Sequence, residues 1–283
     1  MGNASSHNAF YIQRDITEWY QDGSLWDRIA GTNGYDEFEG IFPGSYFDMS
    51  RYIKASAIGG GSSTQGGRRI LIIGCNNLYN TGHKSSSDIL DIEHGLVFKL
   101  DFSHIVCTPI AHFGESKMNL TNTTEGGYTS SFMNTDIIGP ATTTGNVAGT
   151  INEQLYAEFG GHLKSYRELL STEINATYNN RIGKSDNLGA SNNWNWSLIQ
   201  SVLMSESEVY GSISSGSSLY DIGCAKSQFS LFKLNNISIN NTYSYWLKDV
   251  ASATNFCMNF YHGASSHSKA SDKYYVRPRF VLA

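Results

Sequence analysis

Tyr243-Ser-Tyr-Trp-Leu-Lys-Asp-Val250 is rich in apolar, aromatic and β-branched residues, and so is Tyr275-Val-Arg-Pro-Arg-Phe-Val-Leu282. Residues of these types are enriched in β-strands, so both segments are predicted to be framework strands of one sheet. The residues between them, 253–274, are of a different kind, because Tyr, His, Asn, Ser and Gly dominate there. We therefore expect a rigid strand pair that carries a polar, aromatic insert.

The insert has the composition of a recognition surface. Antibody loops combine rigid amphipathic rings with small polar side chains in the same way. The predicted ligand-binding residues are Thr254, Asn255, Met258, Asn259, Phe260, Tyr261, His262, Ser265, Ser266, His267, Ser268, Lys269, Asp272, Lys273 and Tyr274. Rings are expected to anchor the ligand, and the small polar side chains to adapt to it. The alternative is a polar terminal hairpin with no binding role.

The clearest helical signal lies upstream of these strands. Thr150-Ile-Asn-Glu153 is a capping box, which marks the start of a helix. Apolar residues follow three or four positions apart, as on the buried face of a helix: Tyr156, Phe159, Leu163, Tyr166 and Leu170. The pattern predicts a helix over residues 150–170 with Gly160 and Gly161 inside it, packed on the C-terminal sheet. Glu158 and His162 fall off the apolar stripe and are expected to be solvated.

The rest of the chain predicts short helices followed by strands. Asp15-Ile-Thr-Glu18 is a second capping box, and Gly23 and Gly31 are expected to end two short helices. Strands are predicted at residues 42–47, 70–73, 96–100 and 105–110. The order of elements contains no βαβ alternation and indicates an α+β fold, with a single domain over residues 1–283. The glycine-rich residues 59–67 lack the GK[ST] ending of a phosphate loop and are expected to be a surface loop.

Composition and charge exclude several classes of partner. The formal net charge is -5 and charged residues make up 16% of the chain, whereas nonspecific nucleic-acid binding needs a basic stripe. No apolar run reaches the roughly 18 residues of a membrane span, and the first residues lack the features of a signal peptide. We therefore expect no nucleic-acid partner and no membrane insertion, and a soluble protein made in the cytoplasm.

Residues that could carry catalysis or bind metal show no supporting spacing. The four cysteines form no CxxC pair, and the eight histidines form no HxH or HExxH motif, so free thiols, no metal site and no cofactor are expected. No G-x-S-x-G elbow or EF-hand loop is present, which disfavours a hydrolase and a calcium site. Glu206 and Glu208 alternate along a predicted strand, where a polar strand face is a more ordinary explanation than acid–base catalysis.

Several segments together resemble a C-type-lectin-like family that is common in phages and prophages of gut Firmicutes. They are Trp246-Leu-Lys-Asp-Val250, Val276-Arg-Pro-Arg-Phe280, Leu203-Met-Ser-Glu-Ser-Glu-Val-Tyr-Gly211, Leu155-Tyr-Ala-Glu-Phe159, and residues 15–31 and 109–127. The resemblance spans nearly the whole chain. It implies a lectin-like fold in which residues 253–275 are the variable, ligand-binding region.

The resemblance also implies a function. Related variable proteins, similar in kind to the phage major tropism determinant, are targets of diversity-generating retroelements, which randomise Asn codons. Met258, Lys269 and Lys273 cannot arise from such codons and are either fixed or derived from others. The calcium-ligating triplets of sugar-binding lectins, EPN, QPD and WND, are absent, which argues against calcium-dependent sugar binding.

The function implied is receptor binding on a phage. The protein would lie on the virion surface, on the tail or capsid, as a homo-oligomer such as a trimer, attached to other virion subunits. Its ligand would be a host cell-surface protein or glycan, and it would not be an enzyme. The alternatives are a structural or decoration protein of the virion and a formylglycine-generating type of enzyme, for which Cys224 and Cys257 would have to come together.

Overall fold

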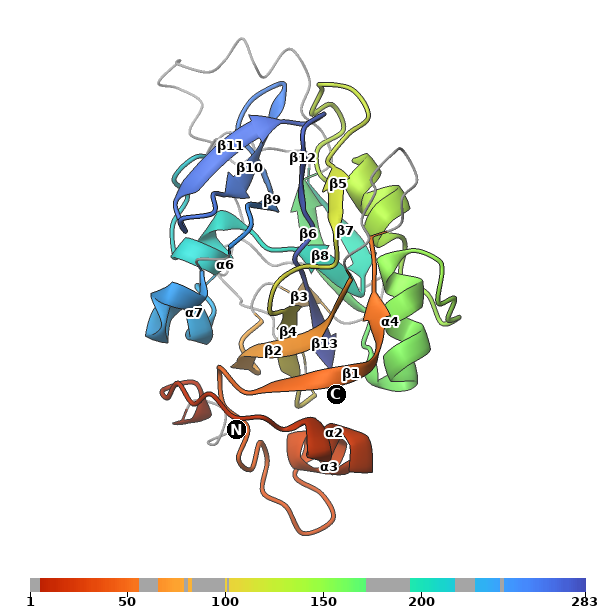
Figure 1. Cartoon of the computed structure of the whole chain (residues 1–283), viewed down its shortest axis with the longest axis vertical. Coiled ribbons are helices and arrows are strands. Elements are labelled where there is room, and N and C mark those ends of the chain that lie inside the picture. Colours follow the sequence, from red (N-terminus) through yellow and green to blue (C-terminus); the bar gives the residue numbers. More distant parts are fainter. Residues whose placement is uncertain are drawn as a thin grey trace.

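The computed structural model describes residues 6–55, 66–78, 81–82, 100, 102–171, 194–216, 227–239 and 242–283. Its buried apolar side chains form one hydrophobic cluster, and helices and sheets surround that cluster (Figure 1). The helices are α2 (Thr17–Asp22), α3 (Ser24–Ala30), α4 (Ile151–Phe159), α6 (Glu206–Tyr210) and α7 (Ser230–Leu234). Single turns of other helix types occur at Met133–Ile138, Gly160–His162 and Asn236–Ser238.

The strands form three sheets. The first has the order β1-β2-β4-β13-β8, with β1 at Tyr46–Ile53, β2 at Gly67–Cys75, β4 at Ile105–Pro109, β13 at Pro278–Leu282 and β8 at Ser201–Leu203. The second has the order β11-β10-β9-β12-β5, with β11 at Ser265–Lys269, β10 at Asn255–Asn259, β9 at Tyr245–Val250, β12 at Lys273–Tyr275 and β5 at Glu115–Lys117. The third joins β3 (Thr81–Gly82), β6 (Tyr166–Ser171) and β7 (Trp194–Ile199) in that order.

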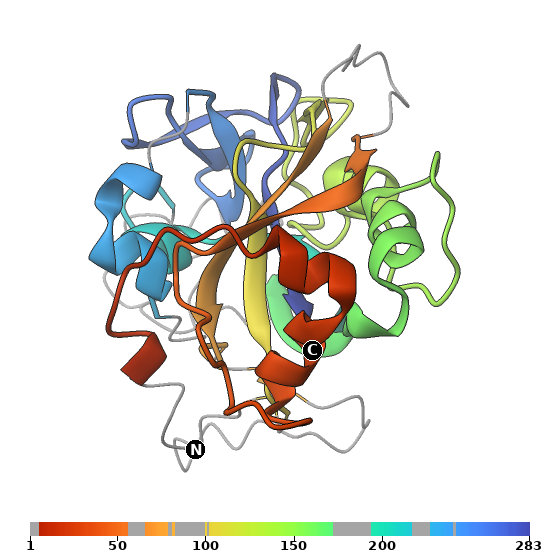
Figure 2. The same cartoon turned by 60° about the horizontal axis from the view of Figure 1, so that its bottom comes forward.

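The fold class predicted from the sequence, α+β, is confirmed. Every strand pair is antiparallel except β9 with β12, which are parallel through the single pair Tyr245 and Tyr275. The helices α2 and α3 pack in front of β1 at one end of the molecule (Figure 2). The hairpin of β10 and β11 lies at the other end (Figure 1).

The predicted framework strands do not share a sheet, which corrects the expectation. β9 belongs to the second sheet and β13 to the first. The C-terminal segment is divided between the sheets, because Tyr275 ends β12 and Pro278 begins β13. At the crossing, Val276 donates to the Gly114 carbonyl (2.7 Å) and accepts from the Phe113 amide (2.8 Å). The two sheets are therefore joined directly where the predicted insert ends and β13 follows.

Helix α4 confirms the predicted capping box but ends earlier than predicted. Thr150 and Glu153 cap each other, with the Thr150 amide 2.8 Å from a Glu153 carboxylate oxygen. The helix stops at Gly160, whose φ of +55° and ψ of -132° lie outside helical values. Residues 166–171 then form strand β6. The apolar residues that suggested one helix over residues 150–170 are thus divided between helix α4, the turn that follows it and strand β6. The prediction of a single helix was wrong.

A glycine is expected to be required at position 160, where helix α4 ends and the chain changes direction. The Gly160→Ala variant should lose about 1–2 kcal/mol of unfolding free energy, because an L side chain is strained at positive φ. A Cβ atom at Gly160 or at Gly161 would meet nothing within 4 Å, and only Gly160 has positive φ. Gly161→Ala is therefore a matched control that should be neutral or slightly stabilising. Urea denaturation of both variants measures the difference, and equal stability would contradict the assignment.

Glu158 and His162 are not solvated, contrary to the prediction. The Glu158 side chain is 1% exposed, and it accepts hydrogen bonds from Tyr20, Ser50 and Arg51 at 2.6–2.9 Å. The His162 ring stacks on Trp26 with 3.8 Å between ring centroids. Both residues therefore fasten α4 and the turn after it to the N-terminal part of the fold.

Other local predictions have mixed outcomes. Two short N-terminal helices are present and end at left-handed Gly23 and Gly31, but Asp15 does not form the capping box with Glu18. Asp15 instead bridges to Tyr46 and accepts from the Thr17 amide. The strands predicted at 70–73 and 105–110 correspond to β2 and β4. Of the strand predicted at 42–47, only residues 46 and 47 are in a strand, as the first two residues of β1. Most of 59–67 and of 96–100 lies outside the described residues.

Candidate functional site

The predicted insert is built around a regular β-hairpin. β10 and β11 pair without a bulge from Asn255 opposite Lys269 to Asn259 opposite Ser265. At the tip, the Gly263 amide donates to the Phe260 carbonyl (2.7 Å). Gly263 has φ of +82°, a conformation that glycine adopts without strain, and it lets the chain return after three residues. The sequence Phe-Tyr-His-Gly thus places three rings at the turn.

The three rings of the hairpin tip form an exposed aromatic cluster. Phe260 is 39% exposed and Tyr261 44% exposed, and His262 is also exposed. The centroids of the Phe260 and Tyr261 rings are 4.4 Å apart, and those of Tyr261 and His262 3.6 Å apart. The Tyr261 amide donates to the Ser244 hydroxyl (3.0 Å), which holds the tip against the loop before β9. Such rings offer large contact area with few rotatable bonds.

Strand β11 carries polar residues along the edge of the second sheet. His267 and Lys269 are exposed and lie on the same face of the strand as each other. The side-chain amide nitrogen of Asn255 lies 3.0 Å from Nδ1 of His267. This contact holds the His267 ring against the start of β10.

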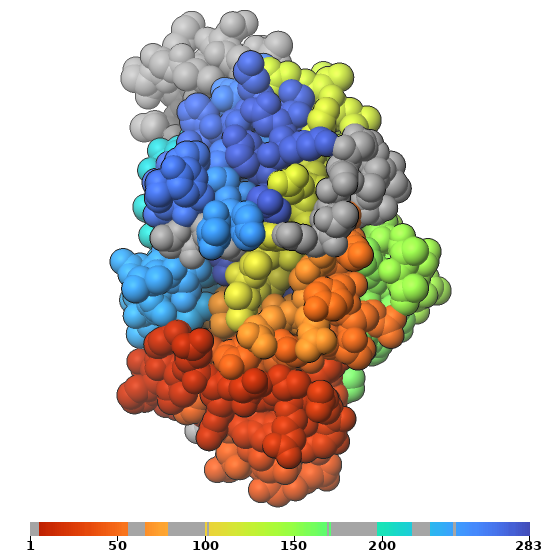
Figure 3. Space-filling view, in the orientation of Figure 1, coloured from red at the N-terminus to blue at the C-terminus, as the bar shows by residue number. Residues whose placement is uncertain are grey.

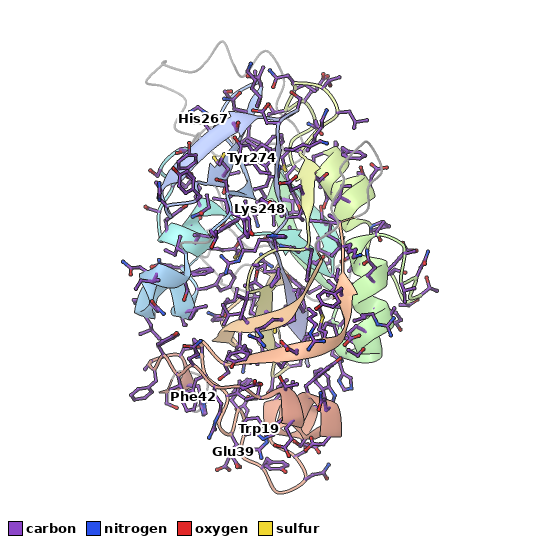
Figure 4. All side chains as sticks on the ribbon, viewed as in Figure 1. Trp19, Glu39, Phe42, Lys248, His267 and Tyr274 are labelled. Atoms are coloured by element: carbon purple, nitrogen blue, oxygen red, sulfur yellow. The ribbon has the colours of Figure 1, made fainter. Side chains whose placement is uncertain are left out.

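The opposite face of the hairpin joins β12. The Ser268 hydroxyl donates to the Asp272 carboxylate (2.7 Å) and lies 3.3 Å from the Tyr274 hydroxyl. The Tyr274 ring meets the Trp246 ring edge-on, with centroids 5.0 Å apart. Trp246 is fully buried, and its indole nitrogen donates to the Ser116 carbonyl (2.9 Å). His267 and Tyr274 lie at the same end of the molecule (Figure 4).

Two of the predicted contact residues are not at the surface. Met258 is 2% exposed and Asn259 0% exposed, because both lie on β10 between its neighbours β9 and β11. Asn259 donates to the Tyr210 hydroxyl on α6 (2.6 Å). These two residues support the surface from inside and are removed from the set of contact residues.

The other predicted residues are at or near the surface. The exposed ones are Thr254, Phe260, Tyr261, His262, His267, Lys269 and Lys273. The half-buried ones are Asn255, Ser265, Ser266, Ser268, Asp272 and Tyr274. Ser265 is already engaged, because its hydroxyl donates to the Glu206 carboxylate and lies 2.7 Å from the Ser215 hydroxyl. It is a structural contact of the hairpin more than an adaptable partner for a ligand.

Glu206 is a support that the sequence interpretation missed. It lies on helix α6, where a strand was predicted, and it is fully buried. Its carboxylate accepts from the backbone amides of Ser214, Ser215 and Gly216 at 2.6–3.1 Å, as well as from Ser265. A signal was present, because Ser205-Glu-Ser-Glu208 is a capping box, and the structure shows that box formed.

A buried ionic cluster lies beneath the second sheet. Lys248 Nζ is 2.6 Å from Glu168, and Arg279 Nη2 is 2.6 Å from Glu168 and 2.8 Å from Glu208. Arg279 also donates to the Tyr166 hydroxyl. The four charged side chains are at most 6% exposed. They come from β6, α6, β9 and β13, so the cluster fixes four elements around one point.

Electrostatics within this cluster favours the charged forms. Burial alone would lower the pKa of Lys248, but the carboxylates of Glu168 and Glu208 outweigh it and raise the pKa above its ordinary value. Burial likewise opposes the charge of Arg279, and the same carboxylates raise the pKa of its guanidinium. Buried opposite charges in close contact stabilise each other in this way. Two cations and two anions therefore coexist in the core.

A second group of rings adjoins the tip and was not predicted. The Tyr275 ring centroid lies 4.0 Å from that of His112 and 4.5 Å from that of Tyr243, and the Tyr275 amide donates to the Ser244 carbonyl. Burial lowers the pKa of His112 to about 4 although Glu115 opposes this shift. Burial and a hydrogen bond with Glu115 raise the pKa of Tyr275 to about 12. His112 is buried beneath this group, whereas the half-buried rings of Tyr243 and Tyr275 continue the aromatic side chains past Ser244.

Features of other functional classes are few in the described ranges. No group of three His, Cys, Asp or Glu side chains there could hold a metal ion. Cys75, Cys107 and Cys257 are buried and unbridged, and Cys224 lies outside the described residues. A cleft of about 620 Å³ runs past Phe102, Tyr156 and Tyr166, away from the hairpin. None of the helices described is both long and apolar enough to cross a membrane.

The hairpin and its neighbours combine three features that are typical of recognition surfaces. They offer an aromatic tip, a polar strand edge and a rigid buried support, at one end of the molecule. Comparison with known proteins finds no matching family model, no similar characterised protein and no similar solved structure.

Proposed function

We propose that this protein is a phage receptor-binding protein with a C-type-lectin-like fold, and that its C-terminal hairpin binds a ligand on the host cell. The observation that carries the proposal is the exposed cluster of Phe260, Tyr261 and His262 on a rigidly supported hairpin. Aromatic anchors surrounded by small polar residues dominate the energetics of recognition surfaces. The proposal includes no catalytic activity.

The support beneath the hairpin favours recognition over a merely polar terminus. The strands that hold the insert are fully buried along β9 and β13, whereas β11 and the tip are exposed or half-buried. Figure 3 shows the blue, late part of the sequence at the surface of the molecule, at the end opposite the red N-terminal segment. A site of this kind can change its side chains with little loss of stability, as repeated diversification of residues 253–275 would require.

The opposite end of the molecule offers a surface for attachment to other virion subunits. Phe10, Tyr11 and Ile12 are consecutive, and they are 58%, 40% and 40% exposed. They lie in the red N-terminal segment, away from the hairpin (Figure 1). A single small surface binds weakly, so several copies on one virion, as in a trimer, would raise the effective concentration at the host surface.

The binding surface can be tested apart from stability. Replacement of Phe260, Tyr261 and His262 together by Ser is expected to reduce adsorption to host cells by about tenfold or more, because the anchoring rings are lost. The melting temperature should change little, since exposed substitutions usually cost within about 0.5 kcal/mol each. Adsorption of purified, labelled protein to host cells is the measurement. Equal adsorption by both proteins at equal melting temperature would contradict the proposal.

Matched controls use exposed apolar residues elsewhere on the surface. Tyr52 is 59% exposed and Ile237 75% exposed, and neither belongs to the hairpin. Tyr52→Ser and Ile237→Ser should leave adsorption unchanged. If the hairpin variant adsorbs normally but fails to assemble into virions, the structural-subunit function is favoured instead.

A further inference from the structure

The outer edge of β11 carries no further strand among the described residues. β11 is the last strand of the second sheet, and its partner in that sheet is β10. Two backbone hydrogen bonds at the ends of the hairpin show which residues of β11 face β10. The Phe260 amide donates to the Ala264 carbonyl, and the Ala270 amide donates to the Thr254 carbonyl. Bonded pairs alternate with non-bonded pairs in an antiparallel ladder. The backbone amides of Ser265, His267 and Lys269 therefore point away from β10.

These outward groups have few partners in the described part of the chain. The amides of Ser265, His267 and Lys269 have no acceptor there, and the carbonyls of Ser265 and His267 have no donor. The Lys269 carbonyl accepts from the Asp272 amide (2.9 Å). Three N–H and two C=O groups thus remain along five residues, enough for five hydrogen bonds to an added strand.

The edge strand of the first sheet, β1, differs from β11 because its outward amides have partners. On β1, the outermost strand of the first sheet, the outward amide of Asp48 donates to the Thr17 hydroxyl (3.1 Å). The outward amide of Ser50 donates to the Glu158 carboxylate (2.6 Å). Side chains therefore cover the edge of β1, whereas no residue in the described ranges covers the backbone edge of β11 next to the aromatic tip.

β11 also lacks most features that keep edge strands from pairing. Natural edges are commonly blunted by bulges, prolines or charges. The register of β10 and β11 has no bulge, and Ser-Ser-His-Ser-Lys contains no proline and one full charge, on Lys269. Its three serines leave the backbone accessible.

We propose that β11 binds an extended, acidic peptide segment of the receptor as an additional β-strand. This inference rests on the proposed function and names the class of ligand, a protein strand. Main-chain hydrogen bonds supply affinity in such β-augmentation, and alternate side chains supply specificity.

Charge and position define the segment that would fit. His267 and Lys269 are exposed on one face of β11, and within the described residues neither forms an ion pair with a carboxylate. Asp272, the nearest acidic residue along the chain, is bonded to Ser268 on the other face. The paired segment is thus expected to carry Asp or Glu at alternate positions and an apolar residue that reaches the rings of Phe260 and Tyr261.

The test separates backbone pairing from side-chain contact at His267. The probes are a random 12-residue peptide display library and a glycan array. Wild type should enrich peptides with alternating acidic residues and no proline. His267→Pro removes the outward N–H and places a ring where the added strand would approach, so it should weaken binding of those peptides about tenfold or more. His267→Ala keeps the backbone and should weaken binding by about threefold at most.

Stability controls keep the result interpretable. The His267 amide makes no hydrogen bond within the described structure, so proline is tolerated there as at other solvent-facing edge positions. Ser266→Pro removes an inward amide and should unfold the hairpin. If His267→Pro also unfolds, hydrogen exchange in wild type decides, because bound peptide should slow exchange at His267 and Lys269.

Three outcomes would overturn the inference. They are equal peptide binding by His267→Pro and His267→Ala at equal stability, no slowing of amide exchange on binding, or binding of glycans in place of peptides. In each case, loss of adsorption in the triple Ser variant of the tip would still support the proposed function. The two proposals can therefore fail separately.

Discussion

Arg279→Ala is expected to lower the free energy of unfolding by about 3–5 kcal/mol. The substitution removes one of the two cations that the described residues place beside the buried carboxylates; Lys248 remains, 2.6 Å from Glu168 and 3.8 Å from Glu208. Removal of one member of a buried ion pair typically costs this much, because an uncompensated charge remains in a medium of low polarity. The Tyr166 hydroxyl also loses the hydrogen bond from Arg279.

Urea denaturation followed by tryptophan fluorescence measures the loss. Arg68→Ala is the matched control, because the Arg68 side chain is 44% exposed and pairs with Asp48 at the surface. Exposed ion pairs contribute about 0–1 kcal/mol, so the control should retain nearly full stability. A loss below about 1 kcal/mol in Arg279→Ala would mean that the cluster does not hold the four elements together.

The bounds of the polar, aromatic insert were easier to predict from the sequence than the sheets around it. A change from apolar to mixed aromatic and polar composition is visible locally, and the hairpin of β10 and β11 lies within that change. The choice of sheet was not predictable in the same way. β9 and β13 have similar compositions, but β9 pairs with β10 whereas β13 pairs with β4. A pairing such as that of β13 with β4, between segments far apart in sequence, leaves no local pattern from which it could be predicted.

The wrong helix over residues 150–170 has a similar cause. Phe159, Leu163 and Tyr166 are all buried, as predicted, yet only Phe159 lies in α4. Buried residues at intervals of three or four positions can all lie on one helix. The same spacing also arises when a short helix, a tight turn and a strand follow one another and face the same core. Two adjacent glycines were the signal that the first explanation was incomplete.

Buried charge was the least predictable part of the support. Charged residues are almost never fully buried unless they are paired, so a sequence alone predicts that they are solvated. Glu158 and Lys248 are buried because each meets partners from elements far away in sequence. Glu206 combines nearby backbone amides with the distant Ser265 hydroxyl on β11. The long-range partners of these charged side chains therefore became visible only in the structure.

The indole of Trp246 is expected to connect the stability of the fold to the geometry of the binding surface. Trp246→Ala should cost about 3–5 kcal/mol, since truncation of a large buried aromatic leaves a cavity. Trp246→Phe keeps a ring beside Tyr274 but loses the hydrogen bond to the Ser116 carbonyl, so about 1–3 kcal/mol is expected.

Chemical denaturation of both variants, with Tyr261→Ala as an exposed aromatic control, measures these losses. The control should change by no more than about 0.5 kcal/mol, because Tyr261 is 44% exposed. A loss of Trp246→Ala no larger than that of the control would contradict the packing. If Trp246→Phe folds but binds more weakly, Trp246 also sets the shape of the surface, because it contacts both Tyr274 on β12 and Ser116, the residue paired with Tyr274 on β5.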